Sequence, residues 1–127
     1  LLCMDYKTNK ITYAAANNQP IIIQNNTFIE LQKDRMPVGM GERKENFKLY
    51  ELTFTPNNTI YLYTDGYADQ FGGPNGKKFK YKNLNQLLLD ITDLDPTEQK
   101  QKLSDHFNNW KGDLEQVDDV CVIGIRT

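Results

Sequence analysis

Alternation of apolar and polar positions predicts β-strands in the first half of the chain. Residues 10–16 are predicted to form a strand after a turn at Thr8-Asn9, and residues 20–24 and 27–31 flank the pair Asn25-Asn26. Asparagine tolerates the positive φ angles of a tight turn, so we expect a β-hairpin at this pair. The first half of the chain therefore consists mainly of strands and turns.

Three further segments have strand character, and one between them does not. Residues 47–54 alternate with period 2, whereas residues 59–64 are apolar on both faces, which is typical of a strand covered on both sides of a sheet. Residues 120–125 predict a final buried strand. Residues 1–5 are expected to be the tail of a strand, so the chain is expected to begin inside a domain. Residues 35–41 contain two glycines and a proline and predict a shaped loop.

The period changes in the second half, where two helices are predicted. Residues 83–91 place their leucines and isoleucine on one helical stripe. Asp95 and Pro96 are typical of a helix start, and this helix should run to about Trp110 and end near Gly112. The order of strands, two helices and a last strand predicts an α+β fold with mainly antiparallel sheets.

Composition and charge limit the classes of function. The chain has 127 residues, of which 39% are hydrophobic and 25% charged, as in a single soluble globular domain. Its formal net charge of −2 and the lack of a basic stripe argue against nucleic acid as a partner. No apolar run approaches the roughly 20 residues of a membrane helix, so no membrane contact is expected. The lysine-rich residues 77–82 are a local exception, and a solvated turn is favoured there over a phosphate clamp.

The chain has two cysteines, Cys3 and Cys121, both in apolar runs and far apart in sequence. Buried free thiols in a reducing cytoplasm are the favoured interpretation, and a disulfide is the alternative. We therefore expect a cytoplasmic protein.

Two aspartates adjoin predicted strands. Asp65 directly follows strand 59–64, and Asp118 directly precedes strand 120–125. If these strands are antiparallel neighbours, both carboxylates lie at one edge of the sheet, where hard oxygen ligands suit Mg²⁺ or Mn²⁺. From spacing alone, ordinary turn residues are the favoured interpretation.

Four longer motifs reverse that preference. Residues 62–69 (LYTDGYAD) and 118–123 (DDVCVI) resemble the "YTDG…E" and "DD(V/I)T" segments of SpoIIE-like phosphatases, a branch of the metal-dependent type 2C superfamily. Residues 16–20 (ANNQP) are similar to the family's "AGHNP" turn, with Asn17 for glycine and asparagine for histidine. Residues 36–39 (MPVG) resemble its "PLG" element. Each motif is weak alone, and together they cover nearly the whole chain in family order.

The resemblance implies a protein serine/threonine phosphatase that uses two Mn²⁺ or Mg²⁺ ions to activate water against a phosphoserine or phosphothreonine. It implies that Asp65 and Asp118 are the catalytic metal ligands and that Gly66 lets the backbone turn close to the metals. Asp119 is expected to order its loop. The implied partner is a phosphorylated protein in bacterial signalling, with an antagonist of an anti-sigma factor as one candidate.

Several positions depart from the family pattern. Asp69 stands where glutamate is usual, Cys121 where threonine is usual, and Lys80 where a glycine follows the phenylalanine. His106 matches no family motif and is expected to be a partly exposed helix residue. The family's "D…GHG" motif does not occur in these residues.

These departures define what is expected of the chain itself. We expect residues 1–127 to be the C-terminal portion of a SpoIIE-like phosphatase domain, without its N-terminal part. Alone, the chain is expected to be inactive and to self-associate through an open sheet edge near Leu1, Leu2 and Met4. One alternative is a degenerate phosphatase-like module that binds a partner without catalysis. Another is a structural domain whose aspartates are turn residues.

Overall fold

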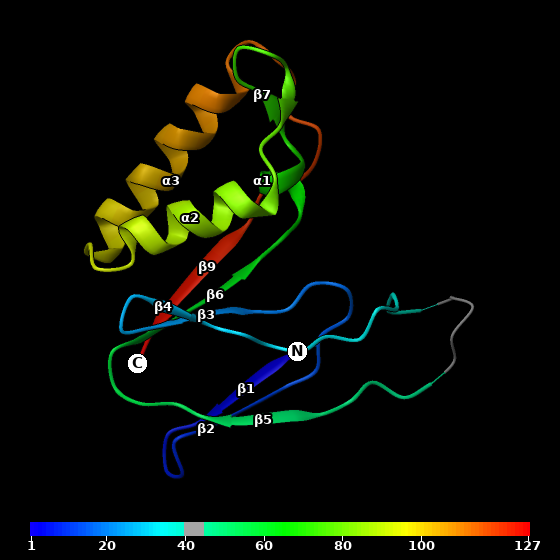
Figure 1. The fold of residues 1–127 in the computed structure, drawn as a ribbon, viewed down its shortest axis with the longest axis vertical. Coiled ribbons are helices and arrows are strands. Elements are labelled where there is room, and N and C mark those ends of the chain that lie inside the picture. Colours follow the sequence, from blue (N-terminus) through cyan, green and yellow to red (C-terminus); the bar gives the residue numbers. More distant parts are fainter. Residues whose placement is uncertain (40–44) are drawn as a thin grey trace. The chain divides into compact units, whose positions relative to one another are not determined.

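The computed structural model describes residues 1–39 and 45–127. The chain forms two compact units, one of residues 1–60 with 125–127 and the other of residues 61–124. Figure 1 shows the strands and helices of both. The described part of the predicted loop 35–41 contains no helix or strand, and its last two residues, 40 and 41, lie outside the described residues.

The first unit contains a three-stranded antiparallel sheet. Its strands are β1 (Leu2–Asp5), β2 (Lys10–Tyr13) and β5 (Tyr50–Thr53), in the order β1-β2-β5. The register places Ile11 between Met4 and Leu52. Strand β5 is shorter than the predicted segment 47–54, but its alternation of half-buried and exposed residues agrees with the predicted pattern.

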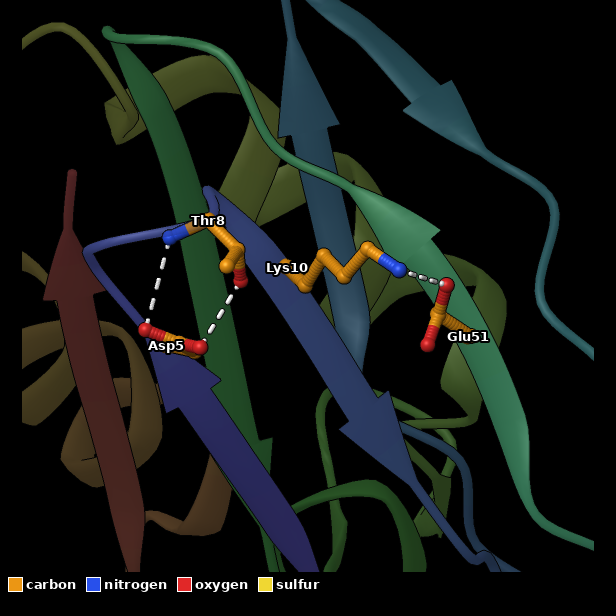
Figure 2. Close-up of polar contacts among 4 residues, drawn as sticks. All are labelled: Asp5, Thr8, Lys10 and Glu51. Carbon is orange, nitrogen blue, oxygen red and sulfur yellow. Dashed lines mark hydrogen bonds and ion pairs between the residues drawn. The ribbon is translucent and has the colours of Figure 1, made fainter.

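The turn between β1 and β2 is held by the side chain of Asp5. Asp5 Oδ1 accepts a hydrogen bond from the backbone N–H of Lys7 at 2.8 Å, and Oδ2 accepts one from the Thr8 hydroxyl at 2.8 Å. Figure 2 shows the contacts with Thr8, and beside them the ion pair between Lys10 Nζ and Glu51 Oε1 at 2.7 Å. These hydrogen bonds, led by that from Thr8, lower the pKa of Asp5. Asp5 is therefore a turn residue.

The predicted hairpin at Asn25-Asn26 is confirmed. Strands β3 (Ile21–Gln24) and β4 (Thr27–Ile29) pair antiparallel, and the two asparagines have φ angles of 48° and 55°. These values are typical of a two-residue turn whose twist matches that of the strands. The hairpin belongs to a four-stranded sheet with the order β4-β3-β6-β9.

One hydrophobic core serves the first unit. Its centre consists of fully or nearly fully buried residues from β2, β3, β6 and the segments that follow β2 and β5: Ile11, Tyr13, Ala15, Ile22, Phe54 and Ile60. Leu2 and Met4 of β1 pack against this cluster, whereas Leu1 is fully exposed. Leu2 and Met4 are thus half-buried within this unit. Self-association of the chain stays a prediction.

Strands β6 (Asn58–Tyr63) and β9 (Val122–Arg126) are antiparallel neighbours. The backbone N–H of Thr127 donates to Asn58 O at 3.0 Å, and that of Thr64 donates to Cys121 O at 3.0 Å. Strand β6 is buried over its first four residues, as its apolar sequence predicted.

The prediction that the last strand is buried was wrong. Strand β9 lies at the edge of the four-stranded sheet, and its residues are half-buried or exposed, with Ile123 50% exposed. The cysteines were also expected to be buried, but Cys3 and Cys121 are both exposed free thiols. Apolar composition cannot tell an edge strand from a central one, because the difference depends on which strand is paired beside it.

The second unit contains the two predicted helices, α2 (Tyr81–Ile91) and α3 (Pro96–Lys111). The side chain of Asp95 caps α3 by accepting hydrogen bonds from the backbone N–H groups of Thr97 and Glu98, and Gly112 ends the helix. The unit also has three short elements that were not predicted: α1 (Gly66–Asp69), β7 (Phe71–Gly72) and β8 (Lys77–Lys78). No helix in the described part of the chain is long and apolar enough to span a membrane.

Aromatic side chains hold the short elements against α3. The ring of Tyr67 lies 5.3 Å from that of Phe79 and 5.1 Å from that of Phe107, and Phe79 lies 5.3 Å from Trp110. The Tyr67 hydroxyl donates to Leu103 O at 2.9 Å, and burial raises its pKa. At the C-terminal end of α3, Trp110 O accepts a hydrogen bond from the backbone N–H of Gly73, the residue after β7. His106, an exposed residue of α3, lies beside this cluster as a helix residue, as predicted.

Candidate metal centre

The two predicted metal-binding aspartates lie on backbone segments that touch within the second unit. Asp65 lies two residues after the end of β6, and Asp118 and Asp119 precede β9. A Cβ atom added to Gly66 would lie 2.5 Å from Asp119 O and 3.3 Å from the carbonyl carbon of Asp118. Antiparallel pairing of β6 with β9 therefore places the two segments together, as expected. The roles of Asp65 and Asp118 as ligands stay predictions.

That Gly66 lets the backbone turn close to the metals stays a prediction, and the structure gives a second reason for a glycine at this position. Gly66 is buried and does not have a positive φ angle. It is required because the backbone of residues 118–119 approaches too closely for any side chain. A Cβ contact of 2.5 Å to a backbone oxygen is one that real structures essentially never show.

The carboxylates of the two aspartates differ in the hydrogen bonds that they make. Asp65 is exposed at the start of α1, and its side chain makes no capping hydrogen bond. Asp118 is also exposed, and its Oδ1 accepts from the backbone N–H of Asp119 at 2.7 Å. Each retains oxygen lone pairs that can bind a cation or water.

Thr64 joins the two segments through its hydroxyl group. The hydroxyl donates to Asp119 O at 2.8 Å and accepts from the backbone N–H of Cys121 at 2.9 Å. Together with the backbone bond from Thr64 N–H to Cys121 O, this gives three hydrogen bonds from Thr64 to Asp119 and Cys121. The sequence motif includes Thr64, but its positioning role was not predicted. Its position directly before Asp65, at the end of a predicted strand, was the sequence feature that could have indicated this role.

Gln70 anchors the loop that leads to Asp118, a role that was not predicted from the sequence. Its side chain is fully buried. Gln70 Nε2 donates to Glu115 O at 2.8 Å, and Gln70 Oε1 accepts from the backbone N–H of Val117 at 3.2 Å. A buried amide whose partners are backbone groups 45 and 47 residues away has no local sequence signal.

Replacing Gln70 with leucine should destabilise this loop. The leucine would leave the Glu115 carbonyl and the Val117 N–H without their partner, and each loss costs on the order of 1 kcal/mol, so we expect a decrease of about 2 kcal/mol in the free energy of unfolding. Urea denaturation of the parent protein would measure it. The control is Gln101→Leu, since Gln101 bonds only an exposed carboxylate one turn away. An equally small effect for both variants would contradict the anchoring role.

Tyr81, the first residue of α2, also lies close to the candidate centre. Its ring centroid is 6.1 Å from that of Tyr63. Burial raises the pKa of Tyr81, and the negative charges of Asp65 and Asp69 raise it further. Lys78 Nζ of β8 lies 3.1 Å from Asp69 Oδ1 at the end of α1. The start of α2 and strand β8 thus border the segment that carries Asp65.

The residues present fit part of a divalent metal site. Within residues 1–39 and 45–127, no three His, Cys, Asp or Glu side chains gather as a metal-binding group. Mg²⁺ is commonly held by one or two carboxylates, with water and substrate phosphate completing its coordination. Asp65 and Asp118 have the ligand type and the number that such a site takes from one region of a protein.

Comparison of the sequence with known protein families shows which family the chain belongs to. The family model of Stage II sporulation protein E (SpoIIE) matches residues 1–127. The chain belongs to the SpoIIE family. No curated protein sequence matches it significantly.

Solved structures show the same fold for this SpoIIE-family chain. The SiaA-PP2C domain of Pseudomonas aeruginosa has a TM-score of 0.89 at 24% identity, over 99% of this chain and 49% of that one. The PP2C phosphatase domain of SpoIIE from Bacillus subtilis, with a fragment of its regulatory domain, has a TM-score of 0.75 at 14% identity, over 98% and 36%. The RsbU and RsbW domains of a Mycobacterium tuberculosis protein give 0.64 at 18% identity, over 97% and 34%.

These matches confirm the predicted fold class. The α+β arrangement with antiparallel sheets is that of PP2C phosphatase domains, with three helices in the described residues rather than the two predicted. The chain spans about half the length of the first of these solved chains and about a third of the other two.

Proposed function

We propose that residues 1–127 are the C-terminal portion of a phosphatase domain that hydrolyses phosphoserine or phosphothreonine on a partner protein in bacterial signalling. The observation that carries this proposal is the contact between Gly66 and the backbone of Asp118 and Asp119. It brings two aspartates, 53 positions apart in a SpoIIE-family chain, to one sheet edge. An antagonist of an anti-sigma factor is the candidate substrate, in keeping with the family resemblance.

In this proposal Asp65 and Asp118 provide carboxylate oxygens for Mn²⁺ or Mg²⁺. When bound, such ions would lower the pKa of a water molecule and neutralise charge on the phosphoryl group. The chain's own contribution is to fix the two carboxylates relative to each other. Thr64 and Gly66 hold the backbone segments in contact, and Gln70 holds the loop before Asp118.

The test is the metal dependence of phosphate ester hydrolysis by the intact parent protein. We expect turnover of p-nitrophenyl phosphate and of a phosphoserine protein with Mn²⁺ or Mg²⁺, and its loss in excess chelator. Re-addition of Mn²⁺ should restore it. Full activity in chelator would contradict the proposal. Binding of the phosphoprotein without turnover under any metal condition would instead favour a module that binds without catalysis.

A further inference from the structure

The lysine segment, residues 77–82 with the sequence KKFKYK, is attached to the helix that follows Asp65. The backbone N–H of Lys80 donates to Ala68 O at 2.7 Å, and that of Phe79 donates to Gln70 O at 2.9 Å. Ala68 lies within the single turn of α1 that begins after Asp65. The lysine segment is therefore not a remote surface turn, because it runs alongside the candidate metal centre.

Three of the four lysines in the segment form no ion pair with a described carboxylate. These three, Lys77, Lys80 and Lys82, are exposed. Lys78 is the exception, since its Nζ pairs with Asp69 and lies 5.8 Å from the centre of the Phe71 ring. Lys77, Lys80 and Lys82 are therefore available to an acidic partner, although the net charge of the whole chain is −2.

Two lysines of the segment are also unfavourable residues for the start of helix α2. Lys80 occupies the N-cap with φ 74° and ψ 148°, a backbone conformation that favours glycine, and makes no side-chain capping bond. Lys82 adds a positive charge to the first turn, where the helix dipole disfavours one. Residues that are unfavourable for the local backbone structure often lie at functional positions.

We propose that the lysine segment is a docking surface for acidic residues that flank the phosphorylated serine or threonine of the protein substrate. The inference rests on the proposed function, because it assumes that a phosphoprotein approaches Asp65. Exposed ammonium groups on flexible stems suit carboxylates of an extended polypeptide, which need charge rather than a fixed bonding geometry. Such surfaces steer association and select partners.

The experiment compares two phosphoserine peptides on the intact parent protein. One has glutamates on both sides of the phosphoserine, and the other has glutamines at the same positions. We expect the wild type to favour the acidic peptide in kcat/KM. The triple variant Lys77→Gln, Lys80→Gln, Lys82→Gln should lower the acidic-to-neutral ratio about tenfold, at roughly twofold per exposed charge pair. Raising the salt concentration should reduce the same ratio in the wild type.

The control variant is Lys100→Gln, an exposed lysine of α3 outside the segment. It should leave the acidic-to-neutral ratio as in the wild type. An unchanged ratio in the triple variant, or an equal fall in the control, would overturn the proposal. An equal loss of kcat/KM on both peptides would also overturn it, because that result would place the lysines on the phosphate itself.

A second measurement does not depend on catalysis. Fluorescence anisotropy of a labelled, unphosphorylated glutamate peptide should show binding at low salt that the triple variant weakens about tenfold. If the parent protein hydrolyses no phosphate ester, the proposed function fails, whereas this binding measurement still tests the docking surface. No binding to the wild type would overturn the docking proposal alone.

Lys80→Gly separates docking from folding. Glycine adopts the backbone conformation of residue 80 without strain, so this variant should raise the Tm by a few degrees. It should still weaken binding of the glutamate peptide, since it removes one of the three lysine charges that form no ion pair with a described carboxylate. A more stable protein with weaker binding supports a functional reason for the lysine. Wild-type binding by Lys80→Gly would contradict that reason.

Discussion

Replacement of Asp65 or Asp118 by asparagine is expected to lower the kcat of the intact phosphatase by at least about a hundredfold, because loss of a carboxylate ligand displaces or loosens a catalytic ion. Asparagine has nearly the same shape as aspartate, so each substitution removes charge and little else. Its side-chain oxygen can still accept the Asp119 N–H, the bond that Asp118 Oδ1 now makes. Steady-state hydrolysis of p-nitrophenyl phosphate at several Mn²⁺ concentrations measures the effect.

Asp119→Asn is the matched control for this prediction. Asp119 adjoins Asp118, and the contacts it makes at this edge are through its backbone N–H and carbonyl, which the substitution retains. We expect its kcat to stay within roughly threefold of the wild type, because it is expected to order the loop rather than bind metal. A hundredfold loss in Asp119→Asn with full activity in Asp118→Asn would show that the ligand had been assigned to the wrong aspartate.

Local chemistry explains why much of the fold was predictable from the sequence. The hairpin at Asn25 and Asn26 follows from the tolerance of asparagine for positive φ angles, and both residues have such angles. The start of α3 follows from the capping preference of Asp95. In each case the deciding interaction joins residues close together in sequence.

The features that were missed depend on distant partners or on very short elements. Strand β9 has the composition of a buried strand, yet its position at a sheet edge leaves Ile123 half exposed. Helix α1 has four residues, too few for a helical period to be visible. The anchoring role of Gln70 rests on hydrogen bonds to the backbone of Glu115 and Val117, and no sequence pattern around residue 70 predicts these bonds.

The candidate site lies between these two cases. The proximity of the Asp65 and Asp118 segments followed from one assumption, that the two apolar strands are antiparallel neighbours, and their pairing confirms it. The interactions that hold the two segments together could not be predicted from the sequence. Three hydrogen bonds at Thr64 and a backbone contact at Gly66 are matters of atomic fit, which composition and spacing do not specify.

Gly66→Ala should reduce activity almost as strongly as loss of a carboxylate, although it removes no ligand. The added methyl group would lie 2.5 Å from Asp119 O and 3.0 Å from the carbonyl carbon of Asp119. Both contacts are with backbone, so no side-chain rotation can relieve them. The segment of Asp65 and that of Asp118 must move apart, and displacement of catalytic groups by about 1 Å can cost on the order of a hundredfold in rate.

The substitution should also strain the Thr64 bonds to Asp119 and Cys121, so we expect a loss of about 2 kcal/mol in the free energy of unfolding. Gly76→Asn is the control, because nothing lies within 4 Å of a Cβ at residue 76 and asparagine tolerates its φ of 57°. Turnover, Mn²⁺ dependence and urea stability should be measured together for both variants. Wild-type turnover in Gly66→Ala would mean that the contact between the two segments is not needed for catalysis. A Gly66→Ala protein that stays folded but needs far more Mn²⁺ would locate the defect in the spacing of the carboxylates.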